Sequence, residues 1–156
     1  MYILYMTEIL PNLFLGNMDY SLNIGFIQLN KINCVINCTI NKPFLDCIKY
    51  KYRIPIKDDK TDTEAYLLYL ILDKVVEIIK QHIYKNDIIL VHCYAGKQRS
   101  VSCILAFLMK YGNMNLDIAL KLLKARYPIA GEPQLNFYKS LKYYENKLLD
   151  DKKLDT

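Results

Sequence analysis

A short segment of the chain combines residue types that suit attack on a bound anion. It reads Val91-His-Cys-Tyr-Ala-Gly-Lys-Gln-Arg-Ser100 and lies between an apolar run of strand length and an apolar stretch of helical length. A loop in this position can turn its backbone N–H groups towards an anion, and the positive end of the following helix points at the same place. Gly96 would permit the tight turn that such a loop needs. The segment therefore predicts an anion-binding loop.

Cys93 is expected to be the nucleophile of this loop. Converging N–H donors and a helix dipole stabilise a thiolate and lower the pKa of a cysteine below its usual value. Arg99 can grip two phosphate oxygens with its planar fork, which a lysine cannot do. Ser100 can donate its hydroxyl to the Cys93 sulfur when that sulfur becomes a leaving group. This set predicts phosphoryl transfer through a phosphocysteine.

The phosphate itself is expected to bind the loop between nucleophile and arginine. The expected phosphate-binding residues are Tyr94, Ala95, Gly96, Lys97, Gln98 and Arg99. His92 is expected to support the loop through hydrogen bonds, a role that is compatible with a buried structural histidine.

Departure of a serine, threonine or tyrosine oxygen from phosphorus also needs a proton donor. Asp58 and Asp59 follow a predicted strand and are the candidates. Two acidic residues in a loop are usually a solvated turn. They become candidates for the general acid because the Cys93 loop requires one, and the residues alone do not choose between them.

Strands and helices alternate along the chain and then give way to a run of helices. Strands are predicted over 13–16, 34–38, 50–56 and 88–91, and helices over 19–29, 61–79, 100–109, 115–126 and 133–149. Thr61 and Glu64 have the spacing at which a hydroxyl and a carboxylate cap each other's backbone N–H groups. Pro133 suits a first helical turn. The order predicts an α/β domain whose central sheet contains parallel pairs and binds ligands beyond the carboxyl ends of its strands.

Length and composition favour one globular domain. The chain has 156 residues, 53% hydrophobic and 24% charged, with no low-complexity run. We expect a catalytic domain over residues 1–149 and a charged, fraying tail over 150–156. The net charge of +5 comes from scattered lysines. It suits anionic substrates but predicts no nucleic-acid groove.

The cysteines favour a reducing compartment, because their number is odd and they form no paired framework. They are Cys34, Cys38, Cys47, Cys93 and Cys103. The segment 1–6 lacks signal-peptide features, and no stretch is long enough to span a membrane. We therefore expect a cytoplasmic protein, with nuclear entry or virion association left open. Cys34 and Cys38 lack a second pair, so we expect core residues and no metal site.

The pattern His92-Cys-x-x-Gly-x-x-Arg-Ser100 resembles the signature of the dual-specificity protein phosphatases, within the cysteine-dependent protein tyrosine phosphatase superfamily. The likeness extends to Ile9–Gly16, which resembles the family's opening strand, to Ile54–Asp58, which resembles its general-acid loop, and to Val101–Met109, which resembles its post-loop helix. It covers residues 8 to 148, and the acidic run after Ile56 is similar to that of small poxviral members. The resemblance implies a central, mostly parallel, twisted sheet flanked by helices.

The resemblance also implies site roles and substrates. Asp58 matches the family's general acid, which leaves Asp59 as a lesser candidate. The family acts on phosphotyrosine and phosphoserine or phosphothreonine in proteins and needs no cofactor. The segment Glu132-Pro-Gln134 departs from the Pro-Asn that the family often has, which concerns loop packing and not the chemistry. The resemblance leaves the oligomeric state open, with a dimer as one option.

Two alternatives remain at this level. Relatives with similar loops act on phosphoinositides or RNA 5′-phosphates, and Lys97 would add a positive charge that suits either. A non-catalytic module that binds phosphorylated residues is the other alternative. Such modules usually lack the cysteine, the arginine or the acid. Because Cys93, Arg99 and Asp58 are all present, we expect an active enzyme.

Overall fold

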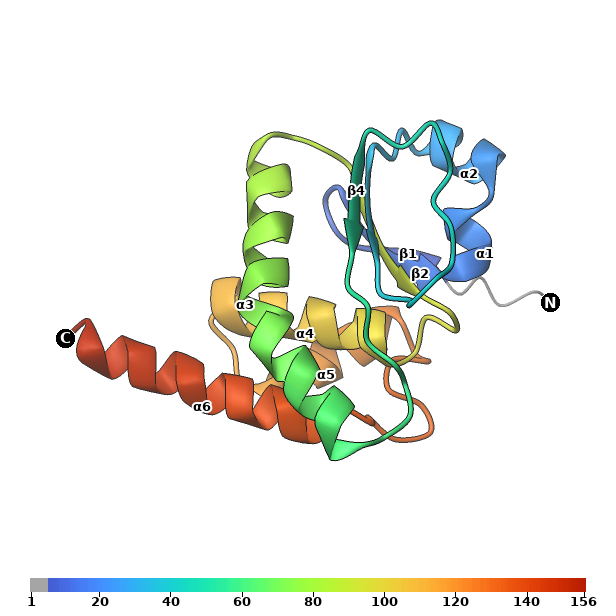
Figure 1. Ribbon diagram of the computed structural model, residues 1–156. Helices are drawn as coiled ribbons and strands as arrows, with labels where there is room; N and C mark the ends of the chain where they lie inside the picture. Colours follow the sequence, from blue (N-terminus) through green and yellow to red (C-terminus); the bar gives the residue numbers. More distant parts are fainter. Residues whose placement is uncertain (1–5) are drawn as a thin grey trace.

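A central sheet covered by helices on both faces forms the framework of the computed structural model, which describes residues 6–156 (Figure 1). The strands are β1 Met6–Leu10, β2 Leu13–Asn17, β3 Cys34–Asn37, β4 Tyr50–Arg53 and β5 Ile89–Cys93. They lie in the order β1-β2-β5-β3-β4. β2, β5, β3 and β4 are parallel to one another, whereas β1 pairs antiparallel with β2. The predicted α/β class with a mostly parallel central sheet is confirmed.

Two hydrophobic clusters of unequal size lie on the two faces of the sheet. The helices are α1 Met18–Ser21, α2 Ile24–Leu29, α3 Asp62–Tyr84, α4 Arg99–Tyr111, α5 Leu116–Arg126 and α6 Tyr138–Leu154. Ile89 and Val91 of β5 join the larger cluster with α3 to α6, and Leu90 between them joins the smaller one with α2. This alternation follows from the two-residue period of a strand. Residues of β5 thus anchor both clusters.

The first strand was not among the predicted elements, although Ile9–Gly16 was expected to open the fold. The structure divides this segment into β1 and β2, joined by a turn in which Asn12 has a φ of 69°. Asparagine tolerates this left-handed conformation better than most residues do. The Asn12 N–H donates to the Glu8 carboxylate at 2.9 Å. The turn therefore returns the chain to form an antiparallel pair at the sheet edge.

The single helix predicted over 19–29 is wrong in one respect, because the structure contains two short helices there. The Asn17 side chain accepts a hydrogen bond from the Tyr20 N–H and caps α1. The Asn23 side chain accepts from the Phe26 N–H at 3.0 Å and caps α2. Asparagine at an N-cap starts a new helix more readily than it continues one.

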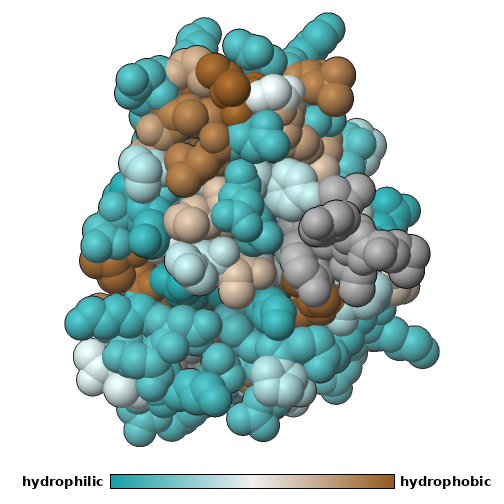
Figure 2. All heavy atoms as spheres, turned by 90° about the vertical axis from the view of Figure 1, so that its right-hand side faces the viewer, coloured by the Kyte–Doolittle hydropathy of each residue, from teal (hydrophilic) through white to brown (hydrophobic). Residues whose placement is uncertain are grey.

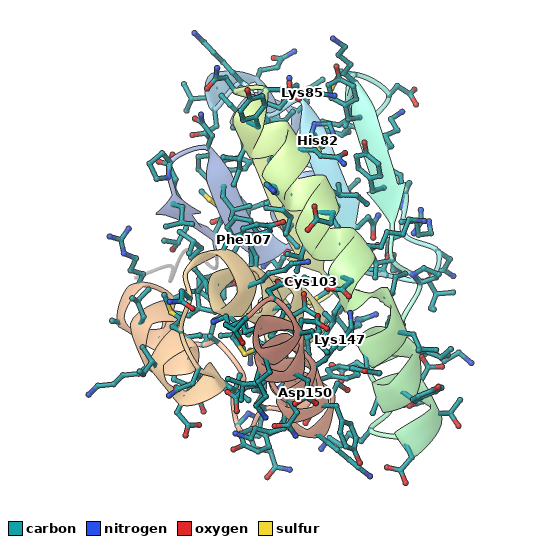
Figure 3. All side chains as sticks on the ribbon, turned by 90° about the vertical axis from the view of Figure 1, so that its left-hand side faces the viewer. His82, Lys85, Cys103, Phe107, Lys147 and Asp150 are labelled. Atoms are coloured by element: carbon teal, nitrogen blue, oxygen red, sulfur yellow. The ribbon has the colours of Figure 1, made fainter. Side chains whose placement is uncertain are left out.

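The helix after the loop is the most buried of the fold. Every residue of α4 from Ser100 to Met109 is buried, as its apolar composition predicted. It ends at Tyr111 with Gly112 as its C-cap, and α5 begins after the N-cap Asn115, whose side chain accepts from the Ile118 N–H. Figure 3 shows Cys103 and Phe107 on α4, which packs against both α3 and α6. The loop is therefore anchored on a helix with almost no solvent-facing side.

The last helix differs from its predicted bounds at both ends. Pro133 was expected in its first turn, but α6 begins at Tyr138. The carbonyl groups of Glu132 and Gln134 instead accept hydrogen bonds from the Gln98 side chain, which holds this segment as a loop. At its other end, α6 continues to Leu154, beyond the expected end at Leu149. The segment expected to fray is thus helical for most of its length.

The expected capping box at the start of α3 is half correct. The Glu64 N–H donates to the Thr61 hydroxyl oxygen at 3.3 Å, so Thr61 is the N-cap. The reciprocal bond is absent, because the Thr61 N–H donates to Asp59 at 3.1 Å. The Glu64 carboxylate is thereby free to accept from the Lys57 N–H at 2.9 Å. These bonds join the start of α3 to the loop that contains Asp58.

The face that carries α2 exposes several hydrophobic side chains. Figure 2 shows them gathered at the top of the view, over the smaller cluster. Leu29 and Ile24 of α2 are 82% and 54% exposed. Among residues 6–156, none of the helices is long and apolar enough to cross a membrane. The prediction that residues 1–6 lack signal-peptide features concerns, except for Met6, residues outside the described part of the chain.

Candidate active site

The predicted anion-binding loop connects the carboxyl end of β5 to the first turn of α4. Cys93 is the last residue of β5, and Arg99 is the first residue of α4. Gly96 has a φ of 70°, a left-handed conformation that favours glycine. A Cβ atom at this position would lie 2.9 Å from the Gly16 carbonyl oxygen and 2.6 Å from the Tyr127 hydroxyl. Glycine is therefore required there by conformation and by space, as the sequence predicted.

The Cys93 sulfur lies at the base of the loop, beside the Ser100 hydroxyl. Cys93 is 2% exposed and Ser100 is fully buried. Their Sγ and Oγ atoms are 3.1 Å apart, within hydrogen-bonding distance for sulfur. The structure thus brings together the two residues that the sequence paired. A hydroxyl in this position can donate to a thiolate.

The Arg99 guanidinium divides its donors between the protein and the site. Its Nη1 donates to the Ile56 carbonyl oxygen at 2.9 Å, which ties the loop before Asp58 to α4. Its Nε is buried and has no hydrogen-bond partner among residues 6–156. Buried N–H donors normally have a partner, so a group left without one calls for an explanation. An anion held in the loop would supply it.

His92 is fully buried directly before the nucleophile. Its Nδ1 lies 3.4 Å from the Cys93 carbonyl oxygen, and its Nε2 has no partner among the described residues. Burial, above all, lowers the pKa of His92 to about 4; the contact with the Cys93 carbonyl opposes the shift, and the charges of Arg53 and Arg99 add to it. His92 is therefore neutral at pH 7 and does not serve as a cationic phosphate ligand.

The two candidate acids have different partners. Asp59 accepts hydrogen bonds from the Thr61 N–H at 3.1 Å and the Thr61 hydroxyl at 2.7 Å, and these bonds lower the pKa of Asp59. It belongs to the turn that starts α3. Asp58 accepts at its Oδ1 from the Asn136 side-chain amide at 3.0 Å. A carboxyl committed to a turn is a poor proton donor, so the geometry favours Asp58.

The outer rim of the loop carries an exposed aromatic residue. Tyr94 is 57% exposed, and the Lys42 ammonium lies 5.6 Å from the centre of its ring. The Tyr94 carbonyl accepts from the Met18 N–H at 3.2 Å, which fixes the loop to the start of α1. Lys97 is half-buried, and its carbonyl accepts from the Gly131 N–H at 2.7 Å. Lys42 therefore places a positive charge beside Tyr94 at the rim.

Sequence reasoning predicted another role for one side chain near the site and missed a second. Gln98 was expected to contribute as part of the phosphate loop, but its buried side chain makes three hydrogen bonds to the segment before α6. Asn136 lies in that segment and was not singled out. Neither residue carries a local signal, because each role depends on a contact between positions far apart in the chain.

The comparisons with known proteins show the family of the chain. The family model described as "Dual specificity phosphatase, catalytic domain" matches residues 13–147. Dual specificity protein phosphatase 14 of Mus musculus is 34% identical over 142 residues, which are 90% of this chain and 69% of that protein. Dual specificity protein phosphatase 16 of Homo sapiens is 37% identical over 144 residues, which are 91% of this chain and 21% of that protein.

A solved structure supports the same fold. The crystal structure of human DUSP28 matches with a TM-score of 0.82 and 21% identity, over 95% of this chain and 97% of that one. The fold and the matches together define a phosphoric monoester hydrolase of the α/β class. Within that class, the chain belongs to the dual specificity phosphatase family.

Proposed function

We propose that this protein hydrolyses phosphotyrosine and phosphoserine or phosphothreonine in proteins, with Cys93 as the nucleophile. The observation that carries the proposal is the Arg99 side chain. One of its N–H groups holds the Asp58 loop through the Ile56 carbonyl, while its buried Nε is without a partner among the described residues. A phosphate bound above the Cys93 sulfur would take that donor. The same residue would then align the acid, the anion and the nucleophile.

In the first step, the Cys93 thiolate attacks phosphorus and the bond from phosphorus to the ester oxygen breaks. Asp58 gives its proton to the departing oxygen, which leaves as the free hydroxyl of the product. The loop N–H groups of residues 94–98 and the amino end of α4 would stabilise the charge on the phosphoryl oxygens. The Arg99 fork would hold two of these oxygens.

In the second step, water attacks the phosphocysteine and the bond between phosphorus and sulfur breaks. Asp58, now a carboxylate, takes a proton from that water. The Cys93 sulfur departs as a thiolate, and the Ser100 hydroxyl at 3.1 Å donates a hydrogen bond to it. The products are inorganic phosphate and the enzyme with Asp58 protonated again. All atoms and protons are then accounted for without a cofactor or metal ion.

The first test is Cys93→Ser, which keeps the loop but replaces the nucleophile with a weak one. Turnover of a phosphotyrosine peptide should fall to background, while binding of that peptide persists because Arg99 and the loop amides remain. Activity and binding are measured on the same preparation. Turnover close to wild type in this variant would remove Cys93 from the mechanism.

A parallel assay tests the substrate class. The purified protein is given a phosphotyrosine peptide, a phosphothreonine peptide, a phosphoinositide and an RNA with a 5′-triphosphate. We expect turnover of both peptides, since the exposed Tyr94 offers an aromatic surface beside the loop. Preferential turnover of the phosphoinositide or of the RNA would replace the protein substrate with that class.

We also propose that residues 1–149 form one catalytic domain, followed by a charged tail over 150–156, and that the protein acts in the cytoplasm. The family model extends over residues 13–147, which supports a single domain. All five cysteines are free, and burial, together with the charge of Asp87, raises the pKa of Cys34 to about 12. Thiols of this kind suit a reducing compartment.

A further inference from the structure

The side chain of Gln98 is a fixed bracket between the phosphate-binding loop and the segment that precedes α6. It is 4% exposed, and both ends of its amide are used. Its Nε2 donates to the Glu132 carbonyl at 3.1 Å and to the Gln134 carbonyl at 2.8 Å. Its Oε1 accepts from the Asn136 N–H at 2.8 Å. A buried amide with three such bonds has one orientation, so the segment is fixed relative to the loop.

A backbone contact strengthens this bracket. The Gly131 N–H donates to the Lys97 carbonyl at 2.7 Å, directly beside Gln98 in the loop. Gly131 has a φ of 72°, the left-handed conformation that favours glycine, and this directs its N–H to the loop. Two successive loop residues therefore hold the start and the end of residues 131–136. The segment has no regular secondary structure of its own and takes its shape from the loop.

The segment ends at the carboxyl group that we propose as the general acid. The Asn136 side-chain amide donates to Asp58 Oδ1 at 3.0 Å. The bond from Asn136 is to Oδ1, which leaves Oδ2 to carry the transferred proton. The Arg99 Nη1 holds the Ile56 carbonyl two residues earlier at 2.9 Å. The acid is thus held at its backbone by Arg99 and at its side chain by Asn136.

We propose that Gln98 and Asn136 are positioning residues for Asp58. Gln98 fixes the 131–136 segment on the phosphate loop, and Asn136 holds one oxygen of Asp58 so that the other faces the departing oxygen of the substrate. The proposal rests on the proposed function, because it assigns the placement of that acid. Neither residue donates or accepts the transferred proton. A misplacement of a catalytic group by 1 Å can lower a rate by about 10²-fold, so loss of these hydrogen bonds should have a measurable effect on kcat.

The test compares two substrates that differ in their need for an acid. Phenyl phosphate has a basic leaving oxygen that must be protonated, whereas p-nitrophenyl phosphate releases a stabilised anion. Asn136→Ala should lower kcat for phenyl phosphate by about 10–10²-fold and change kcat for p-nitrophenyl phosphate little. KM should change little with either substrate, because the phosphate loop is intact. Equal losses with the two substrates would overturn the proposal.

A double variant separates positioning from a general structural role. In an Asp58→Ala background, Asn136→Ala should cause no further loss with phenyl phosphate, because there is no acid left to position. A further loss of the same size as in the wild-type background would also overturn the proposal. If Asn136→Ala folds poorly by circular dichroism, Asn136→Ser provides the same comparison with a shorter side chain that keeps polarity.

Gln98→Leu tests the other end of the bracket, since leucine has a similar volume and none of the three bonds. Like Asn136→Ala, it should reduce the ratio of kcat for phenyl phosphate to kcat for p-nitrophenyl phosphate. An unchanged ratio would show that Gln98 is not a positioning residue. Gln28→Leu is the matched control, on the exposed face of α2, and should leave both rates unchanged. If Asp58→Ala lowers kcat equally for the two substrates, Asp58 is not the general acid and the proposed function is wrong on that point. If Asp58→Ala lowers kcat more for phenyl phosphate but Asn136→Ala does not, only the positioning role is wrong.

Discussion

The two ends of the parallel sheet differ in whether every buried polar group has a hydrogen-bond partner. At the amino end, His82 Nδ1 lies 2.7 Å from Asp87 and its Nε2 lies 2.8 Å from the Tyr52 hydroxyl. The Asn33 side-chain amide donates to the other Asp87 oxygen at 2.7 Å. Figure 3 shows His82 near one end of α3, well away from Cys103 of α4. Each of these groups has a partner.

At the carboxyl end, two buried nitrogens have no partner among residues 6–156. They are His92 Nε2 and Arg99 Nε, on either side of the Cys93 loop. Unpaired buried donors are costly, and native structures contain few of them. The contrast indicates that the polar groups of the amino end stabilise the fold, whereas Arg99 at the carboxyl end has a donor available for a substrate. Variants at Asp87 and variants of the catalytic residues should therefore change different properties.

After the loss of the nucleophile in Cys93→Ser, the largest effect on activity is expected for Asp58→Ala. It should lower kcat by about 10²–10⁴-fold for a phosphoserine peptide, the usual contribution of general acid catalysis, and leave the melting temperature nearly unchanged. Asp59→Ala is the matched control in the same loop. Steady-state kinetics on both variants decide the assignment, and a large loss in Asp59→Ala with none in Asp58→Ala would exchange their roles.

Protonation of His92 should destabilise the fold in acid. Its native pKa of about 4 lies below the ordinary value of 6.5, so the unfolded chain binds this proton first as the pH falls. The stability is fully present above pH 6.5 and is lost progressively down to pH 4, by about 3 kcal/mol in all for this one group. Urea unfolding at a series of pH values measures this slope. His92→Gln should reduce the dependence of the free energy of unfolding on pH. If that dependence is unchanged, other groups cause the loss of stability in acid.

At the amino end, Asp87→Ala should lower the free energy of unfolding by about 1–3 kcal/mol, because it removes the partner of the buried His82 and of the half-buried Asn33. Burial alone would raise the pKa of Asp87, but the hydrogen bonds of His82 and Asn33 outweigh it and lower that pKa. Urea unfolding gives the stability, and kcat at a temperature well below the midpoint should stay at the wild-type value. A specific loss of kcat in the folded variant would contradict the division between the two ends.

The parts that sequence reasoning predicted depend on neighbours in the chain. Cys93, Gly96 and Arg99 lie within one loop, and the strand before it and the helix after it show their burial in composition alone. N-cap residues such as Thr61 act on N–H groups two or three residues away. Local geometry of this kind depends mainly on the spacing of residues in the chain. The predicted position of the loop between a strand and a helix, and the N-cap at Thr61, therefore agreed with the structure.

The parts that sequence reasoning did not predict depend on contacts between distant positions. Pro133 suits a helix start, but the Gln98 side chain donates to the carbonyl groups on either side of it. The helix α6 therefore begins later, at Tyr138. The carboxylate of Glu64 could cap Thr61, but Asp59 takes that N–H and Glu64 binds Lys57. The intrinsic preference of a residue for a helix or a cap is weak, and a tertiary contact can override it. A single sequence does not reveal which distant residue will compete.

The most direct test of the account is to trap the covalent intermediate. The Ser100→Ala variant lacks the hydroxyl that stabilises the departing thiolate, so the phosphocysteine should accumulate with p-nitrophenyl phosphate. A rapid denaturing quench followed by mass spectrometry of the peptides should find phosphate on Cys93, at a level close to that of the enzyme. Phosphate on another residue, or turnover with no phosphorylated peptide, would contradict the account.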